Sequence, residues 1–218
     1  YFVIRGGVVA YDGWNDVTYP IDATDVLFSL WRVSRFMLDP SALLVDLLKA
    51  DMDASSVLTE EEFEEVASGG LTALIEGREA TVTSLEELLD HFGYDGTTAG
   101  VLKLKLKAPL DKGLRDAYLG ILSGGFAEIL PMEYLLGDDY EEALAAAEGG
   151  KNPSAFANYV NEVADEDPGH QLMHENPVGS GPYYIKEIVP NSYIILEVNP
   201  YYWNATLWED LYGVTVTP

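Results

Sequence analysis

The sequence contains no cysteine, which excludes disulfide bonds, thiolate nucleophiles and zinc sites built on cysteine. It is also poor in positive charge, because 12 lysines and arginines stand against 37 aspartates and glutamates, and the net charge is −25. Negative charge on this scale repels phosphate groups, so we expect no nucleic acid among the partners. No apolar run approaches the ~20 residues that a membrane-spanning helix requires.

The chain also lacks the usual start of a secreted precursor. Its first residue is Tyr1 rather than methionine, and no basic and apolar leader follows. We therefore expect these 218 residues to be part of a longer protein. A hydrophobic content of 48% is typical of a chain that folds around a core and not of a disordered one.

The most distinctive motif that the sequence does contain is Pro177-Val-Gly-Ser-Gly-Pro-Tyr183. Two glycines around one serine predict a tight turn, and the second proline directs the following chain into an extended conformation. Residues 183–189 and 193–198 are rich in β-branched and aromatic side chains, which predicts a β-hairpin around the turn residues 190–192. The motif lacks the third glycine of a dinucleotide-binding loop and the glycine spacing of a hydrolase nucleophile elbow, so neither chemistry is expected.

This stretch and its continuation resemble a motif of the family 5 extracellular solute-binding proteins, the peptide, nickel and oligosaccharide receptors of ABC importers. The family pattern is Pro-Val-Gly-Thr-Gly-Pro-Tyr, a hairpin, and then Asn-Pro-x-Tyr-Trp. Here Ser180 replaces the threonine, and the hairpin is followed by Asn199-Pro-Tyr-Tyr-Trp203. The match is long and ordered, which makes it fairly specific.

Three further landmarks occur in the order of that family. Residues 1–13 predict two short strands in a hairpin followed by an Asp-Gly turn. Residues 22–34 predict a helix in which Asp22 caps the first turn and Asp25 adds negative charge where the helix dipole favours it. Residues 101–107 alternate leucine and lysine without a break, which places the leucines in the core and the lysines in water.

The remaining elements follow from periodicity and turn residues. The core face of the first helix is expected to carry Val26, Leu27, Leu30, Trp31 and Ser34. Further helices are predicted over residues 40–50, 84–92, 132–147 and 152–163, with strands at 80–83 and 211–216. We interpret eight motif residues as architectural: Asp22, Asp25, Gly179, Gly181, Pro182, Tyr183, Asn199 and Trp203. Of these, Tyr183 and Trp203 are expected in the core rather than against a ligand.

The resemblance implies a mixed α/β fold, a lobe like those of the type II periplasmic binding proteins, with β-hairpins and packed helices. Residues 1–150 would form a helix-rich α/β segment, the middle domain of the family. Residues 151–218 would form a linker helix and a β-hairpin segment of the first lobe. The second ligand-binding lobe would follow this chain, so we expect these residues to fold but to bind solute weakly or not at all.

The function that the resemblance implies is that of a substrate-binding receptor, without catalysis and without a cofactor. The receptor binds a peptide or a similar small solute outside the membrane and delivers it to the permease subunits of an ABC importer. We therefore expect an extracytoplasmic location, periplasmic or at the cell surface, with a lipoprotein-type membrane anchor upstream of this chain. In the family the loop before an Ile-Leu-Pro sequence lies close to the ligand, and this implies a solute-site wall formed by Ser123, Gly124, Gly125 and Phe126. A place in the core is the alternative for Phe126.

Residues 51–62 have the spacing of a calcium-binding EF-hand loop. The aligned ligand positions are Asp51, Asp53, Ser55, Thr59 and Glu62. Against calcium, Ser56 stands where the sharp turn of such a loop requires glycine. The alternative interpretation is a loop followed by an acidic helix, whose first turn is closed by a capping box of Thr59 and Glu62.

A second metal hypothesis concerns two histidines. His170 and His174 are four residues apart, which places two imidazoles on one helix face as in zinc sites, with Glu175 as the third ligand. The alternative is a polar linker, because Gly169 and Pro177 leave room for only a turn or two of helix.

Two functions of other classes stay open at this level. An acidic glycoside hydrolase needs only two carboxylates, and the 14 tyrosines and 4 tryptophans offer rings on which sugars stack. A calcium-dependent extracellular interaction module depends on the loop at residues 51–62 and is excluded if that loop does not form. Hydrolysis of oligosaccharides would indicate the enzyme, and saturable binding without turnover would indicate the receptor.

Overall fold

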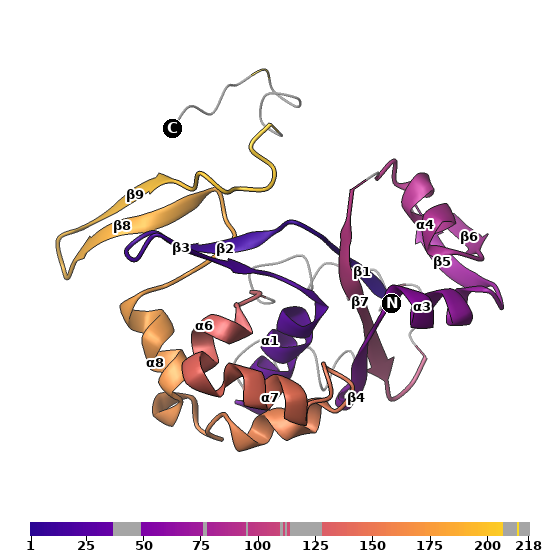
Figure 1. Cartoon of the computed structure of the whole chain (residues 1–218), viewed down its shortest axis with the longest axis horizontal. Helices are drawn as coiled ribbons and strands as arrows, with labels where there is room; N and C mark the ends of the chain where they lie inside the picture. The colour runs from indigo at the N-terminus through magenta and orange to yellow at the C-terminus, as the bar shows by residue number, and fades with distance from the viewer. Residues whose placement is uncertain are drawn as a thin grey trace.

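The structure, a computed structural model, describes residues 1–36, 49–75, 78–94, 96–109, 111, 113, 128–206 and 213. It is a mixed α/β fold, as predicted, built from small antiparallel sheets and short helices (Figure 1). The strands are β1 (Phe2–Arg5), β2 (Val9–Asp12), β3 (Val17–Pro20), β4 (Ala50–Leu58), β5 (Leu71–Ile75), β6 (Arg78–Val82), β7 (Thr98–Leu106), β8 (Tyr183–Val189) and β9 (Tyr193–Val198). The α-helices are α1 (Ala23–Arg35), α3 (Glu60–Ala67), α4 (Leu85–His91), α6 (Met132–Leu136), α7 (Tyr140–Ala146) and α8 (Pro168–Glu175), with 3₁₀ helices η2 (Gly137–Asp139), η3 (Pro153–Asn158) and η4 (Ala164–Glu166). Among the described segments, no helix has the length and apolar character needed to span a membrane.

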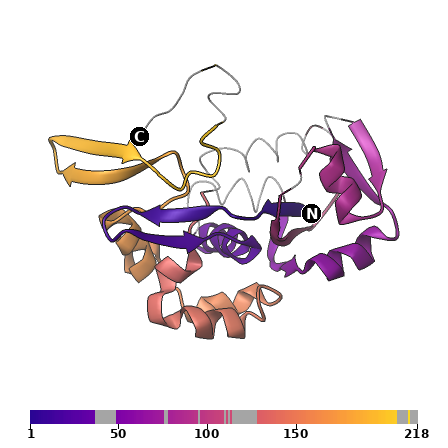
Figure 2. The same ribbon diagram turned by 45° about the horizontal axis from the view of Figure 1, so that its top comes forward.

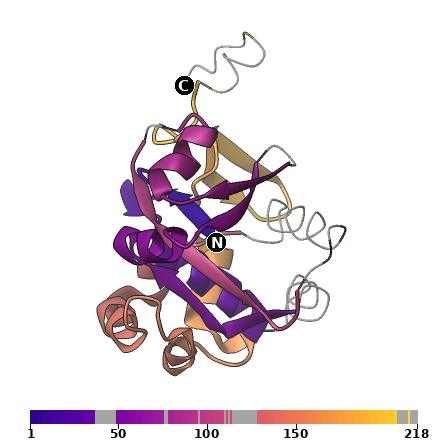
Figure 3. The same cartoon turned by 90° about the vertical axis from the view of Figure 1, so that its right-hand side faces the viewer.

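The largest sheet has three antiparallel strands in the order β1–β7–β4. The leucines of β7, Leu102, Leu104 and Leu106, pack in or against the main core. On the other face Val101 is buried in a smaller cluster with Phe63 of α3 and Leu85 of α4. The predicted strand is therefore confirmed, and both faces of its sheet are covered. Figure 3 shows α4 toward the top of the view and α6 and α7 toward the bottom.

The hairpin predicted within residues 1–13 is wrong in its pairing. Both strands form, but β1 pairs with β7, and β2 pairs with β3. The reason is the Asp-Gly turn, because the Asp12 carboxylate accepts hydrogen bonds from the backbone N–H groups of Trp14 at 3.0 Å and Asn15 at 3.1 Å. These bonds close a tight connection between β2 and β3. Upstream, the N–H of Gly6 donates to the carbonyl of Thr97 at 2.7 Å, which holds β1 beside the start of β7.

The first turn of α1 is closed as the sequence predicts. Asp22 Oδ1 accepts from the N–H groups of Thr24 at 2.6 Å and Asp25 at 3.2 Å, and Asp25 Oδ2 accepts from the N–H of Asp22 at 2.8 Å. This reciprocal capping box satisfies donors that the helix itself leaves free. The boundary predicted at Asp22 is confirmed.

The main core forms around α1. Leu27, Leu30 and Trp31 are buried as predicted. Phe28, which the one-sided pattern omitted, is also fully buried, because its ring meets that of Phe156 at 5.2 Å and 89°. α1 therefore contacts β4 and β7 as well as η3 and α6, and is covered on more than one side.

Two helices differ from their predicted lengths. The stretch 132–147 is interrupted at Gly137, which has a φ of +55° and ends α6. Within the stretch 152–163 only the 3₁₀ helix η3 forms, starting at Pro153. The helix predicted over residues 40–50 lies outside the described residues up to residue 48, and its predicted end is wrong because Ala50 begins strand β4. The strand predicted over residues 211–216 lies outside the described residues, apart from residue 213.

Candidate functional site

The Pro177–Tyr183 motif lies against β2. The N–H of Tyr11 donates to the carbonyl of Gly179 at 3.0 Å, and Val178 is buried in the main core. The buried Asn199 connects this motif to the second half of the pattern, because its side-chain amide donates to the carbonyl of Gly181 at 2.9 Å. The two halves of the sequence pattern are therefore in contact with each other.

The sequence suggested that the two glycines of the motif permit a tight turn that residues with a Cβ resist, but the structure shows no such requirement at either position. Neither Gly179 nor Gly181 has a φ in the left-handed region, and a Cβ on either would meet no atom closer than 4.0 Å. A close approach instead occurs at Gly13, where a Cβ would lie 2.0 Å from the Tyr184 ring. The tight packing between β2–β3 and β8 therefore depends on the Asp-Gly turn.

Asp12 is a buried carboxylate at this junction, 1% exposed. Its Oδ2 accepts from the side-chain amides of Asn15 at 2.7 Å and Asn176 at 3.1 Å. Burial by itself raises the pKa of Asp12, but these hydrogen bonds outweigh it and hold the pKa below its ordinary value. Asp12 is thus a structural anion that joins the β2–β3 turn to the end of α8.

The β8–β9 hairpin forms as predicted and lies beside β2–β3 (Figure 2). The indole N–H of Trp14 donates to the carbonyl of Lys186 at 2.9 Å, and the ring of Tyr184 lies edge-on to Tyr11 at 5.1 Å. Polar contacts follow this side of the hairpin, where Lys186 pairs with Glu197, which also accepts from the hydroxyl of Tyr184. The side of the hairpin that carries Tyr184 and Glu197 therefore faces the β2–β3 turn.

The opposite side of the hairpin is apolar and open. The strand register places Tyr183, Ile185, Ile188, Ile194, Leu196 and Val198 on one face. Tyr183, Ile194 and Leu196 are 55%, 59% and 55% exposed. The expectation that Tyr183 and Trp203 lie in the core is wrong, since Trp203 is also 42% exposed. Aromatic and apolar side chains thus gather on the surface that the motif residues create.

Trp203 takes part in a clamp formed with Arg5 and Tyr94. The guanidinium carbon of Arg5 lies 4.6 Å from the Trp203 ring centroid and 4.8 Å from the Tyr94 ring centroid. The clamp joins the end of β1, the chain after α4 and the chain after β9. Sequence reasoning gave Arg5 no role, because no local pattern indicates that its two aromatic neighbours lie 89 and 198 residues further along the chain.

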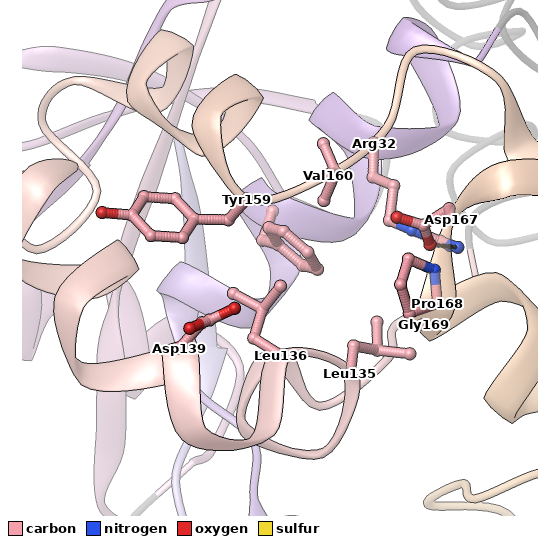
Figure 4. Close-up of a pocket in the computed structure, with 10 residues that line it drawn as sticks. Arg32, Leu135, Leu136, Asp139, Tyr159, Val160, Asp167, Pro168 and Gly169 are labelled. Carbon is pink, nitrogen blue, oxygen red and sulfur yellow. Dashed lines mark hydrogen bonds and ion pairs between the residues drawn. The ribbon is translucent and has the colours of Figure 1, made fainter.

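The buried ion pair of Arg32 with Asp167 borders a small cavity (Figure 4). Arg32 Nη2 lies 2.8 Å from Asp167 Oδ2, and both side chains are at most 4% exposed. The cavity has a volume of about 60 Å³, whereas pockets for small-molecule ligands are typically about 300–1,000 Å³. It is therefore a gap between α1 and α8 that suits a few water molecules and not a peptide.

A more open hollow of about 300 Å³ lies between the N-termini of α1 and α3. Its rim includes Asp22, Thr59 and Lys151. Asp22 and Thr59 already accept from the free N–H groups of their helices, and Lys151 pairs with Glu62. The groups that would select a ligand there are therefore already engaged.

The calcium loop does not form. Residues from Ala50 to Leu58 are strand β4, which pairs with β7 on both sides of a bulge between Asp51 and Ser56. Within the bulge the Ser55 hydroxyl donates to the carbonyl of Asp51 at 2.8 Å, and Asp53 accepts from the indole N–H of Trp31 at 3.0 Å. The physical reason is that β7 offers β4 a sheet partner. The alternative interpretation of the next helix is confirmed, since Thr59 and Glu62 make the reciprocal hydrogen bonds of a capping box. The structure therefore gives the interaction module no loop of the expected form.

The two histidines do share one helix. His170 and His174 lie on α8 with ring centroids 4.7 Å apart. Burial lowers the pKa of His170, and the positive charge of Arg32 lowers it further. In the part of the chain that the structure describes, no group of three or more His, Cys, Asp or Glu side chains is placed to hold a metal ion.

Asp25 is a buried carboxyl group whose protonation is affected by burial. It is 7% exposed, and its Oδ1 accepts from the N–H of Met132 at 2.7 Å. Burial raises the pKa of Asp25 to about 6, although its hydrogen bonds with the backbone lower it in part. The folded pKa therefore lies above the unfolded value of 3.8.

We expect this shift to make the stability contribution of Asp25 depend on pH. Because the folded pKa is raised, the stabilisation from protonation is complete below pH 3.8 and is lost as the pH rises through about 6. Relative to Asp25→Asn, which carries no charge, the native chain should gain about 1 kcal/mol of unfolding free energy between pH 7 and pH 5. Urea unfolding of both proteins at the two pH values measures this. Asp138→Asn, at an exposed acid, is the control. The prediction would be contradicted if the stability difference between the native chain and Asp25→Asn were the same at pH 7 and pH 5.

The predicted wall of the solute site, Ser123 to Phe126, lies outside the described residues. The comparison with known proteins bears on the chain as a whole. A family model described as bacterial extracellular solute-binding proteins, family 5 Middle, matches residues 2–210. No curated protein and no solved structure gives a significant match. The matched range contains the Arg5 clamp and the complete pattern from residue 177 to residue 203.

Proposed function

The chain belongs to family 5 of the bacterial extracellular solute-binding proteins, and we propose that it is part of a receptor that delivers a peptide or similar small solute to the permease of an ABC importer. The observation that carries this proposal is the match of the family model over residues 2–210. Members of this family bind solutes outside the cytoplasm and in general catalyse no reaction. Attachment to the membrane through an upstream anchor belongs to the same proposal.

The exposed side chains beside the motif support solute binding. Tyr183, Tyr201 and Trp203 are each at least 42% exposed and come from the two halves of the family pattern. Aromatic rings supply contact area at a small cost in side-chain entropy, and they are enriched where proteins bind ligands. They suit peptide and sugar ligands equally, so the identity of the solute has to come from experiment.

Ligand-observed NMR on the 218-residue chain tests the proposal, because the method also detects millimolar affinities. We expect saturable binding of at least one class among mixtures of short peptides, oligosaccharides and nickel chelates, with no product formed. Release of reducing sugar from the oligosaccharides would contradict it and would instead indicate a glycoside hydrolase. Absence of binding in all three classes by the full-length protein would also contradict a receptor role.

Phe126 provides a test of the proposed wall. If its ring contacts solute, Phe126→Ala should weaken binding by about tenfold or more, as is typical of aromatic residues that anchor a ligand. The melting temperature should stay nearly unchanged. Val66→Ala, at a residue 38% exposed on α3, is the control and should change neither quantity. A large loss of stability with unchanged affinity would place Phe126 in the core.

A further inference from the structure

Within the described residues, the exposed side chain of Arg5 has no acidic partner, whereas both Arg32 and Arg35 have one. Arg32, Arg35, Lys151 and Lys186 each form an ion pair with an aspartate or glutamate. Within the described part of the chain, no hydrogen bond or ion pair involves the Arg5 side chain, which is exposed. Glu60 accepts a hydrogen bond from Thr98, the residue opposite Arg5 in the sheet, but forms no ion pair with Arg5. An unpaired arginine is notable in a chain with a net charge of −25.

The two aromatic rings hold this cation in place. With ring centroids at 4.6 Å and 4.8 Å from its guanidinium carbon, Arg5 contacts both Trp203 and Tyr94. Stacking of this kind engages the faces of the planar guanidinium and leaves N–H donors on its edge. Because those donors form a rigid fork that matches the two oxygens of a carboxylate, the clamp reduces the entropy lost when one binds.

We infer that Arg5, clamped between Tyr94 and Trp203, binds a carboxylate group of the solute. This inference rests on the proposed receptor function. The net charge of −25 disfavours ligands that are anionic as a whole, so the clamp suits a solute whose carboxylate is balanced by positive charge elsewhere. A short peptide with a free C-terminus has this chemistry.

The test compares trialanine with trialanine amide, by NMR of the arginine Nε–H signals of the 218-residue chain. Long-range electrostatics favours the amide, which carries a net positive charge. If Arg5 binds the carboxylate, the free acid should nevertheless bind about tenfold more tightly and shift the Arg5 signal. Arg5→Gln should abolish this preference, and Arg5→Lys, which keeps the charge without the fork, should retain only part of it.

Arg35→Gln is the matched control, because Arg35 is also exposed but pairs with Glu162 at 2.7 Å. It should leave the preference for the free acid unchanged. Equal binding of trialanine and trialanine amide would overturn the inference. N-acetylglycine serves as a simple carboxylate probe, and an Arg5 signal that responds neither to it nor to trialanine would overturn the inference too. A preference that persists in a folded Arg5→Gln protein would overturn it as well.

Failure of this inference can be distinguished from failure of the proposed function. If solutes bind saturably but independently of Arg5, the receptor function stands and the inference is wrong. If N-acetylglycine shifts the Arg5 signal while no peptide, oligosaccharide or nickel chelate binds saturably to the full-length protein, the carboxylate contact stands and the receptor function is wrong. Thermal unfolding of Arg5→Gln shows whether the clamp also contributes to stability.

Discussion

Replacing Asp167 with asparagine is expected to lower the free energy of unfolding by about 3–5 kcal/mol. The substitution removes the charge that balances Arg32, whose guanidinium is buried and lies 2.8 Å from the Asp167 carboxylate. The side-chain oxygen of an asparagine can still accept from the N–H of His170 and cap α8. The decrease in the free energy of unfolding therefore measures mainly the lost ion pair. Urea unfolding gives the free energy from the midpoint, provided that the slope is unchanged.

Glu162→Gln is the control for that measurement. Glu162 also pairs with an arginine, Arg35, at 2.7 Å, but the two side chains are 80% and 41% exposed. Exposed pairs contribute about 0–1 kcal/mol, so this variant should be nearly as stable as the native chain. If Asp167→Asn cost no more than Glu162→Gln, the buried pair would not hold α1 to α8 in the way that the structure indicates. Replacing both Arg32 and Asp167 by apolar residues should cost less than Asp167→Asn alone.

Phe156→Ala is expected to destabilise the chain by a similar amount, about 3–5 kcal/mol. Phe156 is fully buried, and its ring contacts those of Phe28 at 5.2 Å and Trp31 at 5.8 Å. Truncation removes these contacts and leaves a cavity that the surrounding helices fill only in part. Phe92→Ala is the same chemical change at a side chain that is 59% exposed, and it should cost no more than about 0.5 kcal/mol. Thermal unfolding of both variants tests the contrast, and equal melting temperatures would contradict it.

Local sequence signals predicted the parts of the fold that depend on neighbouring residues. The capping boxes at Asp22 and Thr59 and the hairpin around residues 190–192 all form. Each depends on hydrogen bonds or turn preferences within a few residues of the chain, so the local sequence contains the necessary information. The alternation of β7 was also predictable, because a period of two reports directly which residues face a core.

Contacts between distant residues account for the predictions that were wrong. The calcium loop became strand β4 because β7, about 50 residues further along, offered hydrogen-bond partners. The Pro-Val-Gly-Ser-Gly-Pro-Tyr motif packs against β2 and contacts Asn199, but a side chain could be added at either of its glycines without a close contact. Close packing instead requires a missing side chain at Gly13, because Tyr184 lies against it in the folded chain.

The sequence by itself determined the family, the mixed α/β class, the strand of alternating leucines and the helix caps, because motif order and short-range patterns are written in consecutive residues. Only the tertiary structure decided that β1 pairs with β7, that Trp203 is exposed and that Arg5 lies between Trp203 and Tyr94. These features join residues about 90 to 200 positions apart, and their energy comes from packing and hydrogen bonds that exist only after the chain has folded.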